Sequence, residues 1–389
     1  MNNTLRHADV VMLGTFAAWK LGTIQARALP LASELQKLGV RITIVTTPWD
    51  MPSEAGMVDV VDGVTIVNTN DTSPRAPLMA VMQQVQWVRR LSPALVHVFK
   101  PKGFGGLAGR ALMRSVPVIV DSDDWEGDGG WNQVAGYPRL QQRMFQFQEH
   151  DLLRNALHVT AASTLLEERA LRLRGTDRNL KVHRIANGLT TRRLTDLAAG
   201  RTFPPSRHDP PVVTLYSRFA EFEPGWLEAF TTALNLNLNR PLTLLIVGEP
   251  IAQSNRVKET ELVKVEMMGY VSSDSIPAIL GRSTLAVYPY RDSLITRSKQ
   301  SVKLLELMAA GCPVVASDVG DVAATLGAGG DIVSGAEPET FARRVTQLLD
   351  APDRLDSMSA EGQSRARLRF DFDSLARQLL DVYSDAGLR

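Results

Sequence analysis

The sequence has few of the residues that usually build disulfides and metal centres. Its 389 residues include one cysteine, Cys312, which excludes an internal disulfide framework and a cysteine-built zinc site. The six histidines show no His-Glu-x-x-His spacing, so no resident metal is expected. No apolar run reaches the ~18–20 residues of a membrane span. The first residues have no signal-peptide core, and we expect a cytoplasmic protein.

The sequence also lacks an overall excess of either charge, but its two halves differ. The 43 basic and 42 acidic residues leave a net charge of +1, which argues against a protein that coats nucleic acid. Residues 1–205 carry 24 Lys and Arg against 18 Asp and Glu, a net charge of +6, whereas the remainder carries −5. The basic first half predicts an anionic partner or peripheral contact with an anionic membrane surface.

Short β-rich apolar runs alternate with helix-length segments along the whole chain. Strands that are apolar on both faces and separated by helices predict buried parallel sheets with right-handed crossovers. The segment 196–211 holds four prolines and interrupts the alternation, so it is interpreted as a linker. We therefore expect an α/β fold of two doubly wound Rossmann-like domains, residues 1–200 and 207–370, whose parallel sheets face a central ligand cleft. The predicted strands are residues 10–13, 42–46, 64–67, 95–99, 116–120, 157–160 and 182–185, then 212–216, 242–247, 265–268, 285–288, 313–316 and 332–333.

Residues 286–320 contain the most informative local pattern. A strand ends near Tyr290, a basic loop follows, and Ser301 is the expected N-cap of a helix that Gly311 ends. Because this helix begins at the carboxyl edge of the sheet, its unpaired amide groups and positive dipole end would face the cleft. The pattern predicts an anion-binding site there.

Charged side chains surround the start of this helix. Arg297, Lys299 and Lys303 add three positive charges, and Glu306 lies on the same helix face as Lys303. The cations would bind a diphosphate, and the carboxylate could accept two hydrogen bonds from a ribose diol. The alternative is an amphipathic helix with a Lys303–Glu306 ion pair and a solvated basic loop, because surface charges contribute little by themselves. The combined pattern favours a nucleotide diphosphate site.

The run KLLELMAAGCPVVASDVG at residues 303–320 resembles the donor-site helix of the retaining glycosyltransferases of the family-4 GT-B type, whose usual form is close to LEAMAxGxPVVAS. Residues 370–383 resemble the terminal helix of that family, so 371–389 are expected to pack on the first domain. The resemblance implies the GT-B fold and covers most of the chain. Three further segments agree with the family in order and spacing: KVHRIANG at 181–188, TLYSRF at 214–219 and LIVGE at 245–249.

The resemblance also implies a reaction. Family members transfer a sugar from a nucleotide diphosphate sugar to an acceptor hydroxyl with retention of anomeric configuration, and the leaving phosphate takes the acceptor proton. We expect a UDP-sugar donor, with a GDP-sugar as second choice, and a small-molecule, glycan or lipid-linked acceptor. No metal, other cofactor or nucleic acid is expected, because positioning and cationic side chains would stabilise the departing diphosphate. The residues implied for this role are Arg218, Ser301, Val302 and Lys303, with Arg297 and Lys299 as second choices.

Two positions depart from the family pattern. The family often has two glutamates separated by seven residues, and here Ser298 occupies the first position while Glu306 fits the second. Glu223 stands where the family usually has a lysine, five residues after Arg218. These departures indicate a divergent branch and leave open a non-catalytic GT-B-fold binding protein. A GT-B-fold nucleotide-sugar epimerase is a further alternative, although its histidine- and glutamate-rich pattern is not apparent.

The first domain is expected to bind the acceptor. The segment VDSDDWEGDGGWN follows a strand, and in it Asp123 or Asp124 stands near the family's histidine that touches the donor sugar. Trp125 or Trp131 could stack on a sugar face. One alternative is an acidic N-cap and loop. The other is a manganese site, because Asp121 and Asp123 have the D-x-D spacing of the GT-A transferases.

Other site residues are assigned by their place in the family pattern. Each assignment has a structural alternative: a plain turn for the first pair of residues named below, a core aromatic for the second pair and solvated lysines for the third. The assignments are Gly14 and Thr15 near the diphosphate, Tyr270 and Val271 against the nucleobase, and Lys100 and Lys102 in the acceptor site.

A dinucleotide-dependent oxidoreductase is the remaining alternative. Gly103, Gly105 and Ala108 follow a strand, open a helix and precede Asp123 by the spacing of the Rossmann fingerprint. The motif falls on the fourth predicted strand instead of the first, which disfavours this function.

Overall fold

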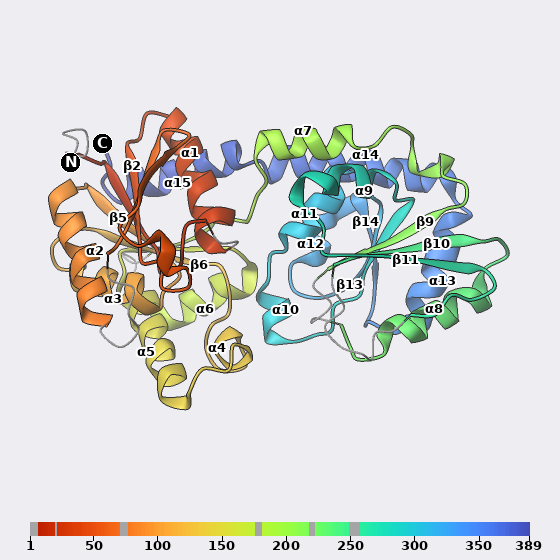
Figure 1. The fold of residues 1–389 in the computed structure, drawn as a ribbon, viewed down its shortest axis with the longest axis horizontal. Coiled ribbons are helices and arrows are strands. Elements are labelled where there is room, and N and C mark those ends of the chain that lie inside the picture. The colour runs from red at the N-terminus through yellow and green to blue at the C-terminus, as the bar shows by residue number, and fades with distance from the viewer. Residues whose placement is uncertain (1–6, 20–21, 71–76, 176–180, 218–221, 249–256) are drawn as a thin grey trace. The chain divides into compact units, whose positions relative to one another are not determined.

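The computed structural model describes residues 7–19, 22–70, 77–175, 181–217, 222–248 and 257–389. The chain forms two compact units, each built around one β-sheet (Figure 1). The first unit comprises residues up to Asn187 together with 298–300 and 372–389, and the second comprises 188–297 and 301–371. Within the described ranges, no helix combines the length and the apolar character needed to cross a membrane.

The first unit contains an eight-stranded sheet with the order β3-β4-β2-β1-β5-β6-β7-β8. Its neighbouring strands are parallel except for the pair β3 and β4. The central strands are buried on both faces, as expected where helices cover a parallel sheet. The strands are β1 (Val10–Leu13), β2 (Ile42–Thr46), β3 (Val58–Val61), β4 (Val64–Asn68), β5 (Leu95–Phe99), β6 (Val118–Ser122), β7 (His158–Ala161) and β8 (Lys181–Arg184).

The antiparallel strand β3 is absent from the sequence prediction. It joins β4 through Asp62 and Gly63, whose φ angles are +49° and +82°. Two consecutive positive φ angles form the tight turn between antiparallel strands, and Asp-Gly is a dipeptide that favours this turn. The Asp-Gly pair was therefore the signal that could have revealed β3.

Two helical layers cover the two faces of the first sheet. On one face α1 and α15 lie side by side, although they come from opposite ends of the sequence (Figure 1). Their apolar residues share a core with Met12, Ile44 and Phe99 of the sheet. The other face is covered by α2, α3, α5 and α6. The helices of this unit are a π-helix (Ile24–Ala28), α1 (Leu29–Lys37), a 3₁₀ turn (Pro52–Glu54), α2 (Pro77–Leu91), α3 (Gly103–Leu112), α4 (Trp131–Val134), α5 (Arg139–Asn155), α6 (Thr164–Arg174) and α15 (Phe372–Asp385).

The second unit contains a six-stranded parallel sheet with the order β11-β10-β9-β12-β13-β14. The prediction of two doubly wound, Rossmann-like α/β domains is thereby confirmed. The strands are β9 (Val212–Tyr216), β10 (Leu242–Val247), β11 (Val263–Gly269), β12 (Leu285–Tyr288), β13 (Val314–Ser317) and β14 (Gly330–Val333).

The helices of the second unit pack in two groups. α8 packs on α13, whereas α11 packs on both α7 and α14, and α7 also contacts α9. The helices are α7 (Thr191–Ala199), α8 (Trp226–Asn237), α9 (Ile276–Gly281), α10 (Leu294–Ser298), α11 (Val302–Ala309), α12 (Val322–Leu326), α13 (Pro338–Leu349) and α14 (Pro352–Arg369), with 3₁₀ turns at Pro205–Arg207, Ser273–Ser275 and Gly327–Gly329.

The predicted linker at 196–211 is wrong at its beginning, because its first residues belong to α7. Thr190 caps this helix, since its Oγ1 accepts a hydrogen bond from the amide of Arg193 at 3.1 Å. Leu194 and Leu197 are buried one turn apart and fix the helix on the second unit. The prolines that follow α7 concealed this short apolar pattern. The division between the compact units falls earlier, after Asn187.

Candidate active site

Glu306 is the centre of a buried charged group in the second unit. Its Oε1 accepts hydrogen bonds from Nε and Nη2 of Arg193 at 2.9 and 2.6 Å, and its Oε2 accepts one from the Tyr216 hydroxyl at 2.7 Å. Arg193 Nη1 also donates to the carbonyl oxygen of Ser273 at 2.8 Å. Since a carboxylate has about four lone-pair sites, roughly one remains, on Oε2, for a ligand hydroxyl.

The fold explains why these residues meet. Tyr216 ends β9, and α11 connects β12 to β13, so both lie at the carboxyl edge of one parallel sheet. Lys303 belongs to the same group, because its Nζ lies 3.7 Å from the centroid of the Tyr216 ring, within cation–π distance. Burial, reinforced by Glu306, raises the pKa of Tyr216, which keeps its hydroxyl a neutral donor.

The start of α11 is placed as the sequence predicts. Ser301 precedes Val302, the first residue of α11, and has the extended backbone of an N-cap, φ −80° and ψ 119°. Its side chain makes no capping hydrogen bond, so the capping interaction expected of it is not formed. The first amides of a helix have no partner within the helix. The first amides of α11 are therefore the groups of this segment that are suited to bind an anion.

Tyr270 and Val271 directly follow β11 at the same carboxyl edge. The Tyr270 side chain is 75% exposed, so the alternative of a core aromatic is wrong. An exposed ring at the edge of a parallel sheet is suited to pack against a planar ligand.

The remaining predicted cations of the donor side are placed in different ways. Arg297 on α10 is paired with Asp292 through both guanidinium Nε and Nη2. Gly320, which has φ +54°, packs closely on the Arg297 backbone, because a Cβ at this position would lie 2.3 Å from the Arg297 carbonyl oxygen. Lys299 belongs to the segment 298–300 that groups with the first unit. Arg218 lies outside the described residues.

The two family departures have contrasting environments. Ser298 is 1% exposed, so the position of the family's first glutamate is buried here. Glu223 lies on the surface, with Oε1 3.9 Å from Nη1 of Arg291. The position of the family's lysine therefore carries an exposed, long ion pair instead of a cation directed to a ligand.

Lys100 is surrounded by three carboxylates in the first unit. Its Nζ lies 2.6 Å from Asp124, 2.9 Å from Glu126 and 3.4 Å from Asp123. The adjacent Lys102 donates to Glu126 and, at 3.0 Å, to the Asn132 side-chain oxygen. Both lysines are buried, so the alternative of solvated lysines is wrong.

The backbone of Lys100 is unusual. Its φ angle is +70°, in the left-handed region that non-glycine residues rarely adopt. Such strain persists where surrounding contacts hold it, and it is concentrated at functional sites. Here the three carboxylates hold the side chain.

The two predicted catalytic aspartates differ in proton affinity. Burial raises the pKa of Asp123 to about 6, and the neighbouring Asp124 and Asp121 add to the increase, although Lys100 opposes it. For Asp124 burial acts in the same direction, but the Lys100 ammonium prevails and lowers the pKa of Asp124 below its ordinary value. The pair therefore offers one ionised carboxylate and one that can exchange a proton near neutral pH.

The two tryptophans occupy different places. Trp131 donates from Nε1 to Asp124 Oδ1 at 3.2 Å, so it joins the Lys100 group. Trp125 donates to the Asp128 carbonyl oxygen at 2.9 Å, and the Arg169 guanidinium lies 4.1 Å from its ring centroid. Because Arg169 covers one face of Trp125, only its other face can stack on a sugar.

The D-x-D pair does not form one group of ligands. Asp121 makes a bidentate ion pair with the buried Arg27, at 2.8 Å for each hydrogen bond, and accepts from Thr160 at 2.6 Å. Asp123 instead accepts from Thr23 at 3.0 Å. A metal between the two aspartates would have to displace Arg27 from Asp121, which leaves a buried charge unpaired.

Sequence reasoning missed the network around Arg27, which lies in the π-helical turn before α1. Arg27 also donates to the backbone oxygens of Ile185 and Ala186 in the IANG segment. The Thr160 hydroxyl is also hydrogen-bonded to His97 Nε2 at 3.2 Å. The other ring nitrogen, His97 Nδ1, is hydrogen-bonded to the Tyr383 hydroxyl of α15 at 2.8 Å. Burial, together with Arg27, lowers the pKa of His97 to about 4.

The predicted loop Gly14–Thr15 packs against the start of α3. Thr15 Oγ1 donates to the Lys102 carbonyl oxygen at 2.9 Å and accepts from the Gly105 amide at 3.1 Å. A Cβ at Gly105 would lie 3.0 Å from the Gly14 carbonyl oxygen. The glycines of the dinucleotide-like motif are therefore explained by close packing of the first turn of α3 against the Gly14–Thr15 loop.

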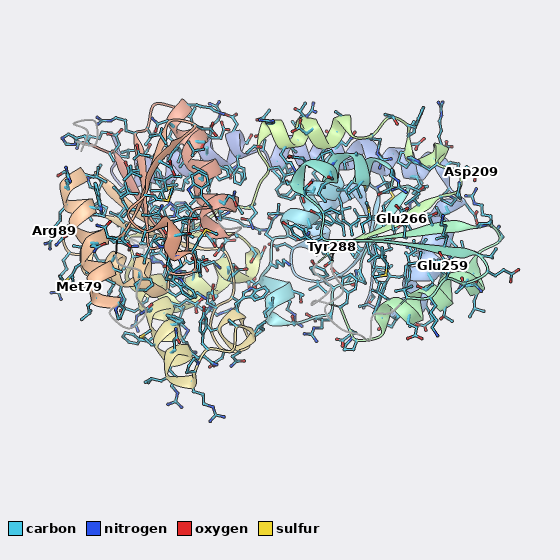
Figure 2. The ribbon with its side chains drawn as sticks, in the orientation of Figure 1. Met79, Arg89, Asp209, Glu259, Glu266 and Tyr288 are labelled. Carbon is cyan, nitrogen blue, oxygen red and sulfur yellow. The ribbon has the colours of Figure 1, made fainter. Side chains whose placement is uncertain are left out.

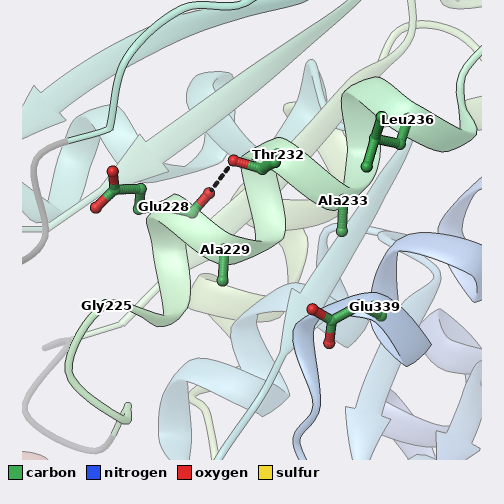
Figure 3. Close-up of a pocket in the computed structure, with 7 residues that line it drawn as sticks. All are labelled: Gly225, Glu228, Ala229, Thr232, Ala233, Leu236 and Glu339. Atoms are coloured by element: carbon green, nitrogen blue, oxygen red, sulfur yellow. Dashed lines mark hydrogen bonds between the residues drawn. The ribbon is translucent and has the colours of Figure 1, made fainter.

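A surface pocket in the second unit shares no lining residue with either charged group. It is formed between α8 and the first turn of α13, and Figure 3 shows the lining residues of α8 together with Glu339 of α13. Its lining contains none of the predicted site residues. The lining residues are Gly225, Glu228, Ala229, Thr232, Ala233, Leu236 and Glu339.

Family models of known proteins match a large part of each unit. Residues 22–188 match the family described as glycosyl transferase 4-like domain, and residues 210–351 match glycosyl transferases group 1. A D-inositol 3-phosphate glycosyltransferase of Salinispora tropica is 30% identical over 152 residues, 38% of this chain and 28% of the relative. A second one, from Thermobispora bispora, is 39% identical over 84 residues, 21% of this chain and 19% of the relative. The matches thus span less than a third of the length of these two relatives.

Solved structures show the same fold over nearly the whole chain. A sucrose-phosphate synthase from Thermosynechococcus elongatus aligns with a TM-score of 0.68 and 17% identity, covering 97% of this chain and 98% of that one. The Anabaena protein HepE, solved in complex with UDP and glucose, aligns with a TM-score of 0.66 and 17% identity over 97% of this chain and 100% of its own. These alignments confirm the predicted GT-B fold.

Proposed function

We propose that this chain, which carries a 4-like and a group 1 glycosyltransferase domain in a GT-B fold, transfers a sugar from a nucleotide diphosphate sugar to an acceptor hydroxyl with retention of configuration. In this proposal the second domain binds the donor and the first domain binds the acceptor. A UDP-sugar is the favoured donor, since HepE of the same fold was solved with UDP and glucose.

The observation that carries the proposal is the group formed by Glu306, Arg193, Tyr216 and Lys303 at the start of α11. Arg193 and Tyr216 fix the Glu306 carboxylate and leave Oε2 able to accept from a ribose hydroxyl. The Tyr216 ring holds the Lys303 ammonium beside the first turn of the helix. A carboxylate for ribose, and a cation beside the first amides of a helix for phosphate, together suit a nucleoside diphosphate.

Catalysis would consist mainly of stabilising the departing diphosphate. Lys303 and the first amides of α11 are the groups assigned to this role, because they oppose negative charge as it develops on the leaving group. Arg218 retains its place in the proposal on the family resemblance alone. In a retaining front-face transfer, the leaving phosphate accepts the proton of the attacking hydroxyl.

The Lys100 group would position the acceptor and the transferred sugar. Asp124 is ionised and can accept a sugar hydroxyl, and Trp131 beside it offers an aromatic face. Asp123, with its raised pKa, can donate or accept a hydrogen bond near neutral pH. D-inositol 3-phosphate is the first acceptor to test, because relatives that match parts of the chain are named for it.

A nucleotide screen followed by product analysis tests the proposal. Thermal shifts with UDP, UDP-glucose, GDP and GDP-mannose should single out one base, and the paired nucleotide sugar should yield product with the acceptor. NMR of the product should show the anomeric configuration of the donor. Failure of every nucleotide to bind, or an inverted product, would refute the assignment.

Independence from metal is tested in the same assay. The D-x-D aspartates are engaged by Arg27 and Thr23, so we propose that cationic side chains replace a divalent ion at the diphosphate. Activity should persist after treatment with EDTA. Activity lost to EDTA and restored by manganese would support the D-x-D alternative.

One specific observation favours a second candidate, a nucleotide-sugar-binding protein without catalysis. The position of the family's first glutamate is a buried serine, Ser298, and Glu223 replaces a family lysine. Such a protein would bind the nucleotide and give no product with any acceptor. Replacing Ser298 with Glu would then create no activity, whereas an active wild-type enzyme excludes this candidate.

We further propose peripheral contact with an anionic membrane through the first domain. Leu140, Met144 and Phe147 are exposed on one face of α5, 81%, 45% and 71% respectively, and Arg139 and Arg143 lie beside them. On α2, Met79 and Arg89 are also surface residues (Figure 2). An apolar stripe flanked by arginines is typical of helices that lie at a membrane surface. Sedimentation with anionic vesicles at low salt should remove the protein from solution, and Phe147→Ser should weaken this binding.

A further inference from the structure

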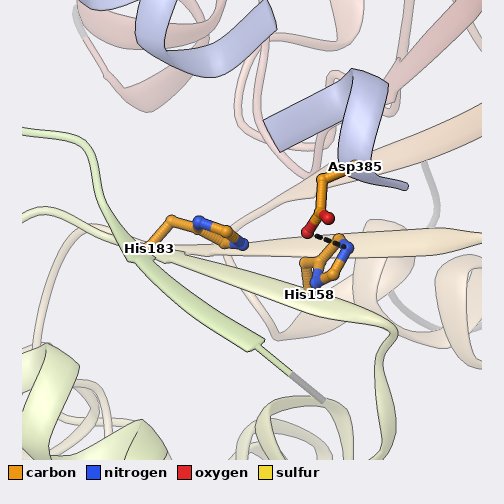
Figure 4. A group of neighbouring side chains, drawn as sticks. All are labelled: His158, His183 and Asp385. Carbon is orange, nitrogen blue, oxygen red and sulfur yellow. Dashed lines mark ion pairs between the residues drawn. The ribbon is translucent and has the colours of Figure 1, made fainter. Parts of the chain in front are cut away.

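Two histidines and an aspartate converge in the first unit, and none of them belongs to either charged group described above. His158 begins β7, His183 lies in β8 and Asp385 is the last residue of α15. One ligand atom of each residue lies within 4.8 Å of those of the other two. Figure 4 shows the two imidazole rings and the carboxylate directed toward one another.

The strand register explains why the histidines meet. His158 pairs with Lys181 and Thr160 pairs with His183 across β7 and β8. Residues two apart on a strand point to the same face, so both histidines project from one face. The rings contact edge to face with centroids 5.1 Å apart. The end of α15 brings Asp385 onto this face, with Oδ2 3.5 Å from His158 Nε2.

The histidine nitrogens lack the partners that buried polar atoms normally have. The His158 side chain is 3% exposed, yet neither of its ring nitrogens has a hydrogen-bond partner among the described residues. Nε2 of His183 is likewise buried without such a partner there. An unsatisfied buried polar atom costs about 1–3 kcal/mol, so a group that fills this position would be favoured.

We propose that His158, His183 and Asp385 bind a divalent d-block cation, with zinc as the best match. Two imidazoles and one carboxylate are a common zinc donor set, and a fourth position open to solvent would take water. In a tetrahedral zinc site neighbouring ligand atoms lie ~3.3 Å apart. The His158–Asp385 separation of 3.5 Å already fits this value.

Lys181 is the main competitor for the site. Its Nζ lies 2.6 and 2.7 Å from the two oxygens of Asp385. The Lys181 side chain is 49% exposed, so it can turn toward solvent when a cation takes its place. The bound ion would fasten the last turn of α15 to strands β7 and β8. The three ligands come from separate elements, which is why no local spacing in the sequence reveals them.

Zinc titration of the full-length, tag-free protein, stripped with EDTA and dialysed, tests the proposal. Equilibrium dialysis should give one zinc per chain and a higher melting temperature, and cobalt should give visible absorption bands of a site with fewer than six ligands. His183→Asn and Asp385→Asn change partly exposed residues and should each weaken zinc binding at least about tenfold. Lys181→Met should strengthen it, because this variant releases Asp385 from its ion pair.

His150→Asn is the matched control, since His150 lies on α5 outside this cluster and its loss should leave zinc affinity unchanged. No zinc binding by the wild type, or equal zinc affinity in the wild type, His183→Asn and Asp385→Asn, would overturn the proposal. A buried water in place of the ion would give neither the zinc stoichiometry nor the cobalt spectrum, and would overturn it as well. None of these measurements depends on glycosyl transfer.

Discussion

Each domain has its own buried charged group at the carboxyl edge of its sheet, but the two groups differ in their ratio of carboxylates to cations. In the second domain one carboxylate, Glu306, is held by Arg193 and Tyr216. In the first domain Asp123, Asp124 and Glu126 gather around Lys100, with Lys102 on Glu126. The group in the first domain therefore carries more negative than positive charge.

This difference has a chemical consequence. A carboxylate that accepts three hydrogen bonds is held in one orientation, which suits recognition of an unchanging group such as a ribose. A site with surplus carboxylates pushes one of them toward protonation, here Asp123. The group of the second domain therefore offers a carboxylate held in one orientation, whereas the group of the first domain offers a carboxyl that can exchange a proton near neutral pH.

The largest expected effect comes from Lys100→Met. The variant removes the cation that three carboxylates share and should lower the free energy of unfolding by about 3–5 kcal/mol. Urea unfolding followed by tryptophan fluorescence measures the change. Lys37→Met is the control, because Lys37 pairs with Glu34 while its own side chain is 66% exposed, and it should cost less than about 1 kcal/mol. Equal losses in the two variants would contradict the buried ion group.

Glu306→Ala and Lys303→Ala test whether the charged group of the second domain binds the nucleotide. Each should weaken binding of the nucleoside diphosphate by about 1–3 kcal/mol, because each removes a charge-assisted contact. Isothermal calorimetry with the nucleotide found in the screen gives the affinity. Glu339→Ala, in the lining of the unrelated surface pocket, should bind as the wild type does. Unchanged affinity in both site variants would remove the donor site from α11.

The pH dependence of stability distinguishes the two groups. Folding raises the pKa of Asp123 from 3.8 to about 6, so the folded state holds this proton more tightly than the unfolded state. The stability from this group is therefore greatest below pH ~4 and is lost as the pH rises to about 6 and beyond, by about 3 kcal/mol in all, of which roughly 2 kcal/mol is lost between pH 4.5 and 6.5. Asp123→Asn should flatten this decline in urea unfolding between pH 4.5 and 6.5. Asp196→Asn, on an exposed face of α7, should leave the decline intact, and a wild-type slope in Asp123→Asn would disprove the assignment.

The smallest expected effect is that of Tyr216→Phe. It removes one hydrogen bond to Glu306 but leaves both donors of Arg193, so the free energy of unfolding should fall by about 1 kcal/mol. Thermal unfolding of the variant measures this change. Tyr270→Phe changes an exposed hydroxyl and should be neutral. A loss above about 3 kcal/mol for Tyr216→Phe would mean that Arg193 does not hold the carboxylate by itself.

The sequence predicted what local periodicity and helix signals determine. The parallel strands and α11 with Ser301 at its start follow from apolar runs, a glycine stop and a capping position. The partners of Glu306 could not be predicted, because Arg193 lies on α7, far from α11 in the sequence, within a stretch that merges into a proline-rich segment. The burial of Lys100 was missed for a related reason, since two lysines beside glycines have the composition of a solvated loop.

The position of α15, which follows the second domain in the sequence but packs on the first sheet, has a consequence for folding during protein synthesis. Tyr383, Leu375 and Leu379 of α15 complete the core that covers β1 and β5, and they emerge from the ribosome after the entire second domain. A nascent chain that has reached residue 371 holds an open apolar face on its first domain. The second domain can therefore complete its folding before the first domain, which is synthesised earlier but lacks α15 until the end of the chain is made.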